Sequence, residues 1–206
     1  MPGTTELTVA CTGVIETADR AGVVGKHVGS LPLWSFLHQT PLTRPGPRLR
    51  ALLAGLGVRQ DEPLGLLHAL SEAVLAAIAY EPGQTDAATT AEEALAAGSG
   101  VCQDHAHVFI GAARALGIPA RYVSGYLLMN DRTEQEAGHG WAEAHVDGLG
   151  WVGFDISNAI SPDAGYVRVA SGRDYAEAAP VTGITFGASD SLLSVSLAVE
   201  QQAVQQ

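Results

Sequence analysis

The spacing of apolar residues changes near Pro119, and this change constrains the fold more than any other feature of the sequence. Upstream of it, apolar residues recur three and four positions apart, as along residues 66–78, which is typical of amphipathic helices. Downstream, apolar and polar residues alternate in "HGWAEAHV" and "WVGFDI", which is typical of strands. Because helices precede strands without alternating with them, the sequence predicts an α+β fold with an antiparallel sheet.

Capping and turn residues predict where the helices and strands begin and end. Thr90 and Glu93 form a capping-box pattern before a short helix that ends at Gly98, and Asp61 is placed to cap the helix over residues 66–78. A further helix should begin near Cys102 and end at "LGIP". The other expected elements are a helix over residues 49–56 and strands in "ELTVACTGVIE" (6–16), "ARYVSGYLLM" (120–129) and "LLSVSLAVE" (192–200).

The composition of the 206 residues narrows the classes of function. The chain has 22 acidic and 11 basic residues, and its formal charge of −11 disfavours binding to nucleic acid or to an anionic membrane. No apolar run is long enough to cross a bilayer and no secretory signal is visible, so a cytoplasmic protein is expected. In a reducing compartment Cys11 and Cys102 should be free thiols. The oligomeric state stays open.

The stretch "GSGVCQDHAHVF" (98–109) places Cys102 at the start of an expected helix. A helix amino terminus lowers the pKa of a thiol, which favours the reactive thiolate. Gly98 and Gly100 allow a tight turn into the helix and let a substrate carbonyl approach the Cys102 amide, a natural oxyanion donor. A cysteine in this position is also often an inert part of the core, and the residues alone leave both interpretations open.

A metal site is the third interpretation of this stretch. Cys102 and His105 would share one face of a helix, but His107 would point away from them. The pattern has neither the helix-spaced histidines of a zinc protease nor the lysine of a phosphate-binding loop. We therefore expect no metal and no organic cofactor.

Three stretches carry a family resemblance. In order, "GVCQDHAHVFIGAARALGIPARYVSGY", "HGWAEAHVDGLGWVGFDISN" and "GRDYAEAAPVTG" resemble the bacterial transglutaminase-like family, which belongs to the papain-like thiol enzymes. The resemblance extends over about residues 64–199. It implies a papain-like core, in which helices pack on an antiparallel sheet and the nucleophile lies at a helix amino terminus.

The resemblance also implies a catalytic triad. Cys102 matches the family's nucleophile, His139 the histidine of its His-Ala-Trp motif, and Asp155 the aspartate of its Asp-Pro-Thr motif. Such a triad forms a thioester with an amide carbonyl of a protein or peptide substrate. We expect a peptidase or amidase, with two alternatives: a protein-glutamine transamidase, or a binding or scaffold domain that keeps the fold without turnover. His145, on the same strand face as His139, is the rival base.

The chain departs from the family pattern in three ways. Alanine of the His-Ala-Trp motif is Gly140 here, and Asp-Pro-Thr is replaced by Asp155-Ile156-Ser157, which removes a rigid φ after the aspartate. Family members usually have further strands before the equivalent of residues 6–16. We therefore interpret residues 1–47 as the remnant of a longer β region, residues 48–200 as the catalytic domain and residues 201–206 as a tail.

The positions of other polar and aromatic residues in the sequence suggest what role each has. For the second oxyanion donor we consider Tyr80 and Trp34, because animal transglutaminases use an upstream tryptophan there. His105 and His107 are expected to be packing or surface residues rather than catalysts. Trp141 and Trp151 are expected in the core or the site wall, and Arg121 with Asp174 is a candidate ion pair.

The turn "DGLG" between the last two strands must satisfy a parity condition. If a two-residue turn at 148–149 joined the strands, His139 and Asp155 would point to opposite faces of the sheet. The triad therefore predicts an odd-length connection, such as residues 148–150, or a β-bulge. If Asp155 lies on the wrong face, Glu143 or Asn158 becomes the candidate group that orients the histidine.

Overall fold

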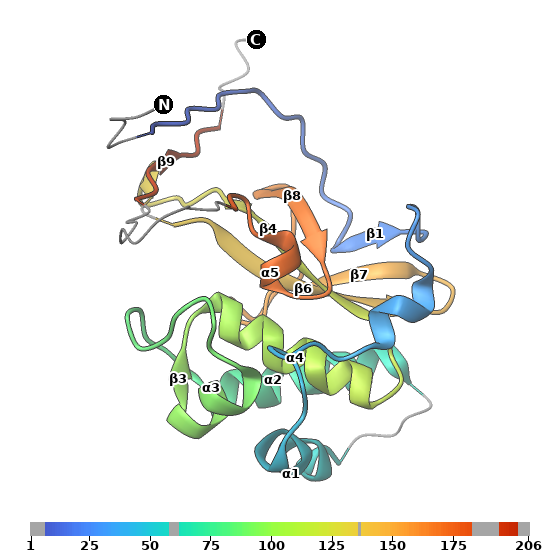
Figure 1. Ribbon diagram of the computed structural model, residues 1–206. Coiled ribbons are helices and arrows are strands. Elements are labelled where there is room, and N and C mark those ends of the chain that lie inside the picture. The colour runs from blue at the N-terminus through green and yellow to red at the C-terminus, as the bar shows by residue number, and fades with distance from the viewer. Residues whose placement is uncertain (1–6, 58–61, 136, 183–193, 202–206) are drawn as a thin grey trace.

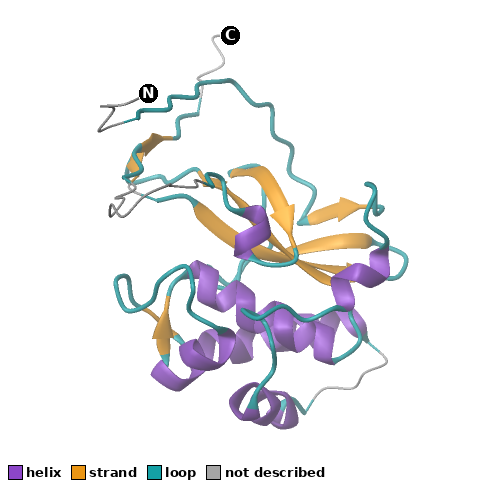
Figure 2. Cartoon of the chain, in the orientation of Figure 1, coloured by secondary structure: helices purple, strands orange, loops and turns teal. Residues whose placement is uncertain are grey.

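The computed structural model describes residues 7–57, 62–135, 137–182 and 194–201. A layer of helices packs against one face of a curled sheet (Figures 1 and 2). The helices are α1 (Pro47–Gly55), α2 (Pro63–Ala77), α3 (Ala91–Ala97), α4 (Cys102–Ala115) and the short α5 (Tyr175–Ala178), with a 3-10 turn η1 at Leu33–Leu37. The α+β class predicted from the sequence is thus confirmed.

The main sheet has the strand order β1-β7-β6-β4-β8, and all its pairs are antiparallel. Its strands are β1 (Val23–Gly25), β4 (Ala120–Leu127), β6 (His139–Val146), β7 (Gly150–Phe154) and β8 (Tyr166–Gly172). The described residues also form two separate two-stranded sheets. They are β2 (Ala79–Tyr80) with β3 (Ser99–Gly100), in parallel, and β5 (Glu134–Gln135) with β9 (Leu197–Ala198).

The core lies between α4 and the sheet. Residues 102–115 are buried almost all round, because the sheet covers one side of α4 and α2, α3 and η1 contact the others. Even-numbered residues of β4, β6 and β7 face α4, among them Ala142 and Phe154. Each buried leucine or phenylalanine contributes roughly 2 kcal/mol of hydrophobic stabilisation. A central helix buried this way fixes the position of its own amino terminus.

Capping residues behave as expected where the structure describes them. Thr90 and Glu93 form the capping box of α3, and Gly98 ends that helix in the left-handed conformation with φ 69°. α4 begins at Cys102 as predicted. α2 begins with Pro63 after Glu62, and the expected cap Asp61 lies outside the described residues.

The connection between β6 and β7 has the predicted odd length. Val146 lies opposite Gly150, so residues 147–149 form a three-residue connection, one position earlier than the example of 148–150. This register places position 155 directly across from Trp141, with His139 two positions further along the same face. The parity that the triad requires is therefore present, and no bulge between β6 and β7 is needed.

The prediction of a strand at residues 6–16 is wrong for the part that the structure describes. Residues 7–16 have no regular secondary structure, and Leu7 and Val9 are more than 80% exposed. Alternation predicts a strand only where a sheet edge is available to pair with it, and the two edges of the main sheet are formed by β1 and β8 instead. Neither β1 nor β8 was predicted. Of the expected last strand (192–200), only Leu197–Ala198 forms a strand, β9, among the described residues, and residues 192–193 lie outside the described part.

Among the described residues, no helix combines the length and the apolar character needed to cross a membrane.

Candidate active site

The chain enters α4 through a tightly held turn. The backbone of β2 bonds to that of β3, from Ala79 N to Gly98 O at 2.9 Å and from Glu81 N to Gly100 O at 2.8 Å. The buried carboxylate of Asp104 accepts hydrogen bonds from Val101 N at 2.8 Å and from Thr85 Oγ1 at 2.7 Å. Cys102 is thereby fixed as the first residue of α4, half-buried, with its thiol free.

Glycine at position 100 is required by this packing. A Cβ there would lie 2.6 Å from Asp104 Oδ2 and 2.9 Å from its Cβ. The absence of a side chain at this buried position lets the Asp104 carboxylate pack directly against the turn. Asp104 therefore supports the turn directly, beyond the first-turn electrostatics expected of an acidic residue.

His139 and Asp155 lie side by side at one end of the sheet. His139 begins β6, and Asp155 directly follows β7, where its backbone bridges to Ile160. The Nε2 atom of His139 is 2.6 Å from Asp155 Oδ2. The odd-length connection brings this pair onto one face, so the structure unites the two residues that the sequence had separated by a hairpin.

Asp155 is held by several donors. Its Oδ2 accepts hydrogen bonds from His139, from the Tyr166 hydroxyl at 2.6 Å and from Asn158 Nδ2 at 2.7 Å, and Oδ1 is 3.3 Å from Asn158 N. Burial alone would raise the pKa of this carboxyl, but these hydrogen bonds and the His139 charge outweigh it and lower the pKa. Asp155 is therefore ionised although only 1% exposed.

Two partners determine the charge of His139. Burial lowers its pKa, but hydrogen bonds to Asp155 and to Cys102, with the negative charges of both, raise the pKa of His139 to about 10. Because Asp155 occupies Nε2, the Nδ1 atom is the one left for the sulfur. The raised pKa thus favours the imidazolium form of His139, which lies between the Asp155 carboxylate and Cys102.

Sequence reasoning missed Tyr166 and assigned Trp141 only to the core or the site wall. The Trp141 ring stacks on His139 at 6.2 Å between centroids and meets the Tyr166 ring edge-on at 5.4 Å. The pKa of Tyr166 is raised, first by burial and then by Asp155, so its hydroxyl stays a donor. Tyr166 lies on β8. Because the sequence did not predict this strand, no sequence signal placed Tyr166 beside Asp155.

His105 links the helix to the turn after Asp155. It is fully buried, with Nε2 3.0 Å from Ile78 O and Nδ1 2.7 Å from Ser157 Oγ. Burial lowers its pKa, so the ring is neutral. Nε2 must then donate to the carbonyl, and Nδ1 accepts from the serine hydroxyl. The hydroxyl of Ser157 is kept where the family has threonine, and it ties the Asp155 turn to α4.

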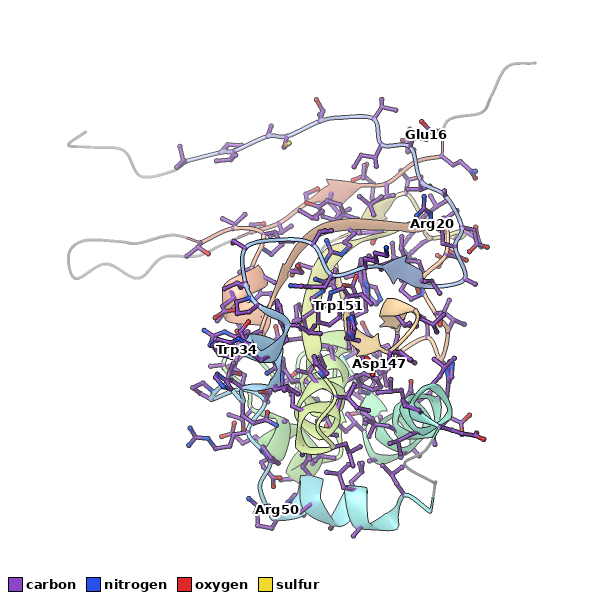
Figure 3. All side chains as sticks on the ribbon, turned by 90° about the vertical axis from the view of Figure 1, so that its right-hand side faces the viewer. Glu16, Arg20, Trp34, Arg50, Asp147 and Trp151 are labelled. Atoms are coloured by element: carbon purple, nitrogen blue, oxygen red, sulfur yellow. The ribbon has the colours of Figure 1, made fainter. Side chains whose placement is uncertain are left out.

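Of the two candidates for the second oxyanion donor, Tyr80 lies near Cys102. Tyr80 pairs with Gly100 across β2 and β3, and its pKa is raised by burial, then by the charges of Cys102 and Asp155. Trp34 is 60% exposed in η1, where its aromatic neighbour is His38 at 5.3 Å, and it lies at the periphery in Figure 3.

The other candidate residues have separate roles. His145 lies edge-on to Trp151 at 5.5 Å, six positions along β6 from His139. His107 is buried, and burial lowers its pKa to about 4. It accepts a hydrogen bond from Tyr175 N at Nε2. Among the described residues, Asp155 receives its imidazole hydrogen bond from His139 and from neither of these rings.

The expected ion pair of Arg121 with Asp174 is wrong. Arg121 Nε is 2.6 Å from Glu143 Oε2, and the guanidinium stacks over the Trp151 ring at 3.9 Å. Asp174 instead caps α5, accepting from Glu177 N at 3.2 Å. Arg121 and Glu143 face each other across β4 and β6, whereas Asp174 lies beyond β8. The Glu143 carboxylate is thus paired with the Arg121 guanidinium.

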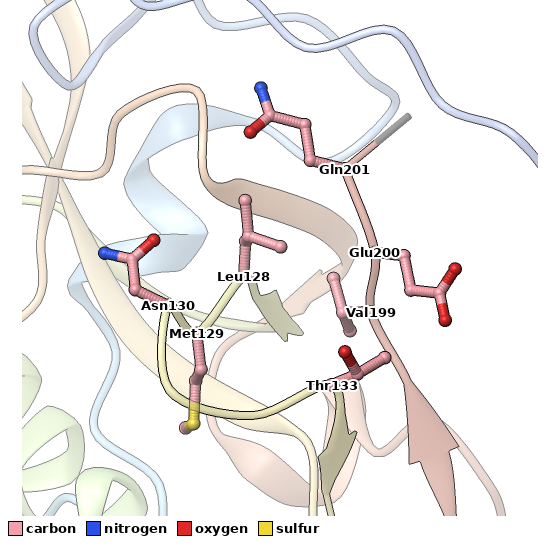
Figure 4. Close-up of a pocket in the computed structure, with 7 residues that line it drawn as sticks. All are labelled: Leu128, Met129, Asn130, Thr133, Val199, Glu200 and Gln201. Atoms are coloured by element: carbon pink, nitrogen blue, oxygen red, sulfur yellow. The ribbon is translucent and has the colours of Figure 1, made fainter. Parts of the chain in front are cut away.

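A pocket of about 380 Å³ opens between the loop after β4 and the last described strand (Figure 4). None of its lining residues belongs to the group around Cys102. Over the described ranges, no three histidine, cysteine or acidic side chains gather in a way that would hold a metal.

A half-buried thiol thus lies at the start of the central helix α4, beside a hydrogen-bonded pair formed by His139 at the start of β6 and Asp155 just after β7. The family model of the transglutaminase-like superfamily matches residues 50–156, and the chain belongs to this superfamily. The resemblance inferred from the sequence is confirmed.

Two proteins with sequences similar to this chain come from mycobacteria. An uncharacterized protein of Mycobacterium leprae is 30% identical over 212 residues, which cover 97% of this chain and 75% of that protein. An uncharacterized protein of Mycobacterium bovis is 34% identical over 145 residues, or 65% of this chain and 46% of that protein.

Among solved structures, a protein of Cytophaga hutchinsonii described as a cysteine protease candidate has a similar fold. The TM-score is 0.66 at 23% identity, and the match covers 91% of this chain and 64% of that protein. This chain therefore spans about two thirds of the length of that structure, and the likeness concerns the fold.

Proposed function

We propose that this protein is a thiol enzyme that cleaves amide bonds of a protein or peptide substrate, with Cys102 as nucleophile, His139 as acid and base, and Asp155 as the group that orients the histidine. The observation that carries the proposal is the hydrogen-bonded His139–Asp155 pair, whose imidazole also interacts with Cys102 at the start of α4.

The proposed reaction begins with the ion pair of Cys102 and His139. The thiolate attacks the amide carbonyl, while the Cys102 backbone N–H donates to the developing oxyanion. His139 transfers its proton to the leaving amine, and a thioester remains on the sulfur. Water, deprotonated by the now neutral imidazole, then attacks the thioester, expels the Cys102 thiolate, releases the acid and restores the thiolate–imidazolium ion pair. The ionised Asp155 stabilises the imidazolium throughout.

Tyr80 is the proposed second oxyanion donor. Its pKa is raised above the ordinary value, so the phenol keeps its proton, and it lies on the strand that pairs directly with the residues before Cys102. At 53% exposure the side chain is accessible to a bound substrate. Trp34 has no comparable support and is not proposed.

The alternative acceptor is an amine, which would make the protein a protein-glutamine transamidase through the same thioester. The two reactions are separated by incubation with a glutamine peptide and a labelled primary amine. Release of free acid without label supports the hydrolase, and incorporation of the amine supports the transamidase.

The experiment that tests the proposal traps the thioester. Wild-type protein and Cys102→Ala are exposed to a peptide library at low pH, and adducts are located by mass spectrometry. We expect an acyl group on Cys102 alone, with Cys11 as an internal control. Absence of any adduct, together with no turnover, would support a binding or scaffold domain instead. A cytoplasmic location stays a prediction.

A further inference from the structure

Strand β8 lies at one edge of the main sheet, yet two of its side chains bind residues beyond the neighbouring strand β4. The Tyr166 hydroxyl donates to Asp155 Oδ2, just after β7, at 2.6 Å. Arg168 Nε donates to Glu143 Oε1 of β6 at 2.8 Å, and Arg168 Nη2 is 3.3 Å from Glu143 Oε2. Both side chains therefore cross over β4. An edge strand is thus attached at two points to the part of the sheet that carries His139.

A β-bulge determines which face of the sheet these two side chains occupy. Ala170 of β8 packs on the helix-facing core. The register with β4 shifts directly after it, so that Val169 is the extra residue of β8 and Arg168 is paired again. Because side chains alternate along a strand, a continuous pairing would turn Arg168 and Tyr166 towards the helices, as it does Ala170. The bulge turns both to the opposite face, where Glu143 lies.

Glu143 is a rigid point of attachment. The side chain is fully buried, and its carboxylate is held by two guanidinium groups. Besides Arg168, Arg121 of β4 donates from Nε to Oε2 at 2.6 Å and stacks over the Trp151 ring. Moving this carboxylate would leave a buried charge without its partner, which is strongly unfavourable. The Arg168 side chain, at 37% exposure, thus ties β8 to a group that is itself held on both sides.

Packed rings occupy the space beside the two attachment points. The Trp141 ring stacks on His139 and meets the Tyr166 ring edge-on, and the rings of Tyr166 and His139 are 6.0 Å apart. A side chain at position 125 of β4 would lie 2.7 Å from Trp141 Cη2, so Gly125 leaves room for the indole. The place of β8 therefore determines where the Tyr166 hydroxyl lies relative to these rings.

We propose that Arg168 is a positioning residue of the site. Its pair with Glu143 fixes β8, and β8 keeps the Tyr166 hydroxyl on Asp155. The Asp155 carboxylate is thereby held where it stabilises the imidazolium of His139. The proposal rests on the proposed function, in which that imidazolium pairs with the catalytic thiolate.

The test measures iodoacetamide alkylation of Cys102 between pH 5 and 9 by mass spectrometry. In Arg168→Gln, alkylation at pH 5 should fall about fivefold relative to wild type, because a misplaced Asp155 weakens the imidazolium that stabilises the thiolate. Arg173→Gln is the matched control. It removes an arginine–carboxylate pair with Glu177 just after β8 and should leave the profile unchanged. A wild-type profile in Arg168→Gln would overturn the assigned role.

Two further variants separate positioning from the loss of a charge. Arg168→Gln removes a positive charge and Glu143→Gln a negative one, so a long-range effect of charge would shift the two profiles in opposite directions and overturn the proposal. Loss of the attachment should shift both in the same direction. If Glu143→Gln does not fold, because buried Arg121 loses its charge partner, Arg168→Lys takes its place. It keeps the charge without the bidentate pairing and should also slow alkylation, whereas a wild-type profile would contradict positioning.

A double variant tests whether Arg168 acts through Tyr166. Tyr166→Phe alone should slow alkylation of Cys102 at pH 5. In the Tyr166→Phe background, Arg168→Gln should slow it by less than about a further twofold, because the hydroxyl that Arg168 positions is already absent. A full effect of Arg168→Gln in that background would overturn the link between the two residues.

The outcomes also distinguish this proposal from the proposed function. A wild-type Cys102 that reacts readily at pH 5, with a profile that Arg168→Gln leaves in place, overturns the role of Arg168 alone. A wild-type Cys102 that reacts only as an ordinary thiol overturns both. Turnover is not needed for either result.

Discussion

At the scale of single residues, the geometry around Asp155 determines the behaviour of the site. One carboxylate oxygen accepts hydrogen bonds from three side chains, and the negative charge of this carboxylate is one reason why the pKa of His139 is raised to about 10. Changes at these residues should therefore appear in pH profiles as well as in rates.

Asp155→Asn should reduce turnover about 100-fold or more, because it removes the charge that stabilises the imidazolium. Without that charge the pKa of His139 falls, since Asp155 raises it in the wild type. The basic limb of the pH–rate profile should then move to lower pH. Asp147→Asn, at an exposed carboxylate in the β6–β7 connection, is the control and should leave the profile in place. An unmoved basic limb in Asp155→Asn would contradict the assigned role.

Tyr166→Phe should lower the free energy of unfolding by about 2 kcal/mol at pH 7, because it removes a hydrogen bond to a buried charge. The pKa of Asp155 is lowered in the folded protein, so the stability it contributes is present above the unfolded-state pKa and is lost as pH falls through the folded value. The difference between variant and wild type should stay constant from pH 7 to about pH 5 and shrink below about pH 4. Urea unfolding at several pH values measures it, and a difference independent of pH would contradict the assignment.

At the scale of helices and strands, the tie between α4 and the turn after β7 holds the two halves of the site together. His105, fully buried on α4, accepts from the hydroxyl of Ser157, two residues after Asp155. This contact takes the place of the rigid proline that the family has after the aspartate, because it restrains the same turn from the side of the helix.

Ser157→Ala should destabilise the protein by about 1 kcal/mol and reduce turnover several-fold, since the turn that carries Asp155 loses its anchor. Ser157→Thr keeps the hydroxyl and should retain most of the activity. Thermal unfolding and initial rates measure the two effects. Equal losses in both variants would mean that the hydroxyl does not act as the anchor.

The helices were predictable from the sequence because their signals are local. Thr90 with Glu93, and the glycine at 98, each act within a few residues of the chain, and the structure places the caps of α3 where the sequence indicated. The candidate residues Cys102, His139 and Asp155 were chosen by their match to family motifs, and the odd-length connection followed from the requirement that His139 and Asp155 share a face.

The remaining features depend on contacts between distant segments. Tyr166 reaches Asp155 only because β8 pairs with β4, and Arg121 finds Glu143 only because β4 pairs with β6. Residues 7–16 show the opposite error. Their alternating pattern predicts a strand, but in the structure these residues do not pair with a sheet. Pairing of strands, unlike capping, is decided by partners that a local pattern does not contain.

At the scale of the whole molecule, the amino-terminal segment divides into two parts. Residues 7–16 are exposed, whereas β1 pairs with β7 and Phe36 of η1 packs edge-on against Trp151 at 5.2 Å between centroids. Trp151 also donates from Nε1 to His27 at 3.1 Å, and Arg114 Nε of α4 donates to Phe36 O at 3.0 Å, so this second part packs against both the sheet and α4. Figure 3 shows Trp151 in the middle of the molecule.

Removal of residues 1–15 should therefore change the thermal unfolding midpoint by less than about 2 °C, because the described part of this segment buries little surface. Phe36→Ala should instead lower the free energy of unfolding by about 3 kcal/mol, the usual cost of emptying a buried phenylalanine site. Calorimetry measures the unfolding midpoint of the truncated protein, and urea titration measures the free energy of unfolding of Phe36→Ala. A large loss from the truncation would show that residues 7–15 pack on the domain in solution.

The central claim is that Cys102 is an activated nucleophile because of its place at the start of α4 and its pairing with His139. The most direct measurement is the rate of iodoacetamide alkylation of each cysteine at pH 5 to 9, resolved by mass spectrometry, with the exposed Cys11 as internal reference. We predict that Cys102 reacts rapidly at pH 5, where a thiol of ordinary pKa is almost fully protonated, and that His139→Ala abolishes this advantage. Equal, slow reaction of both cysteines at pH 5, rising together only above about pH 8, would contradict the account.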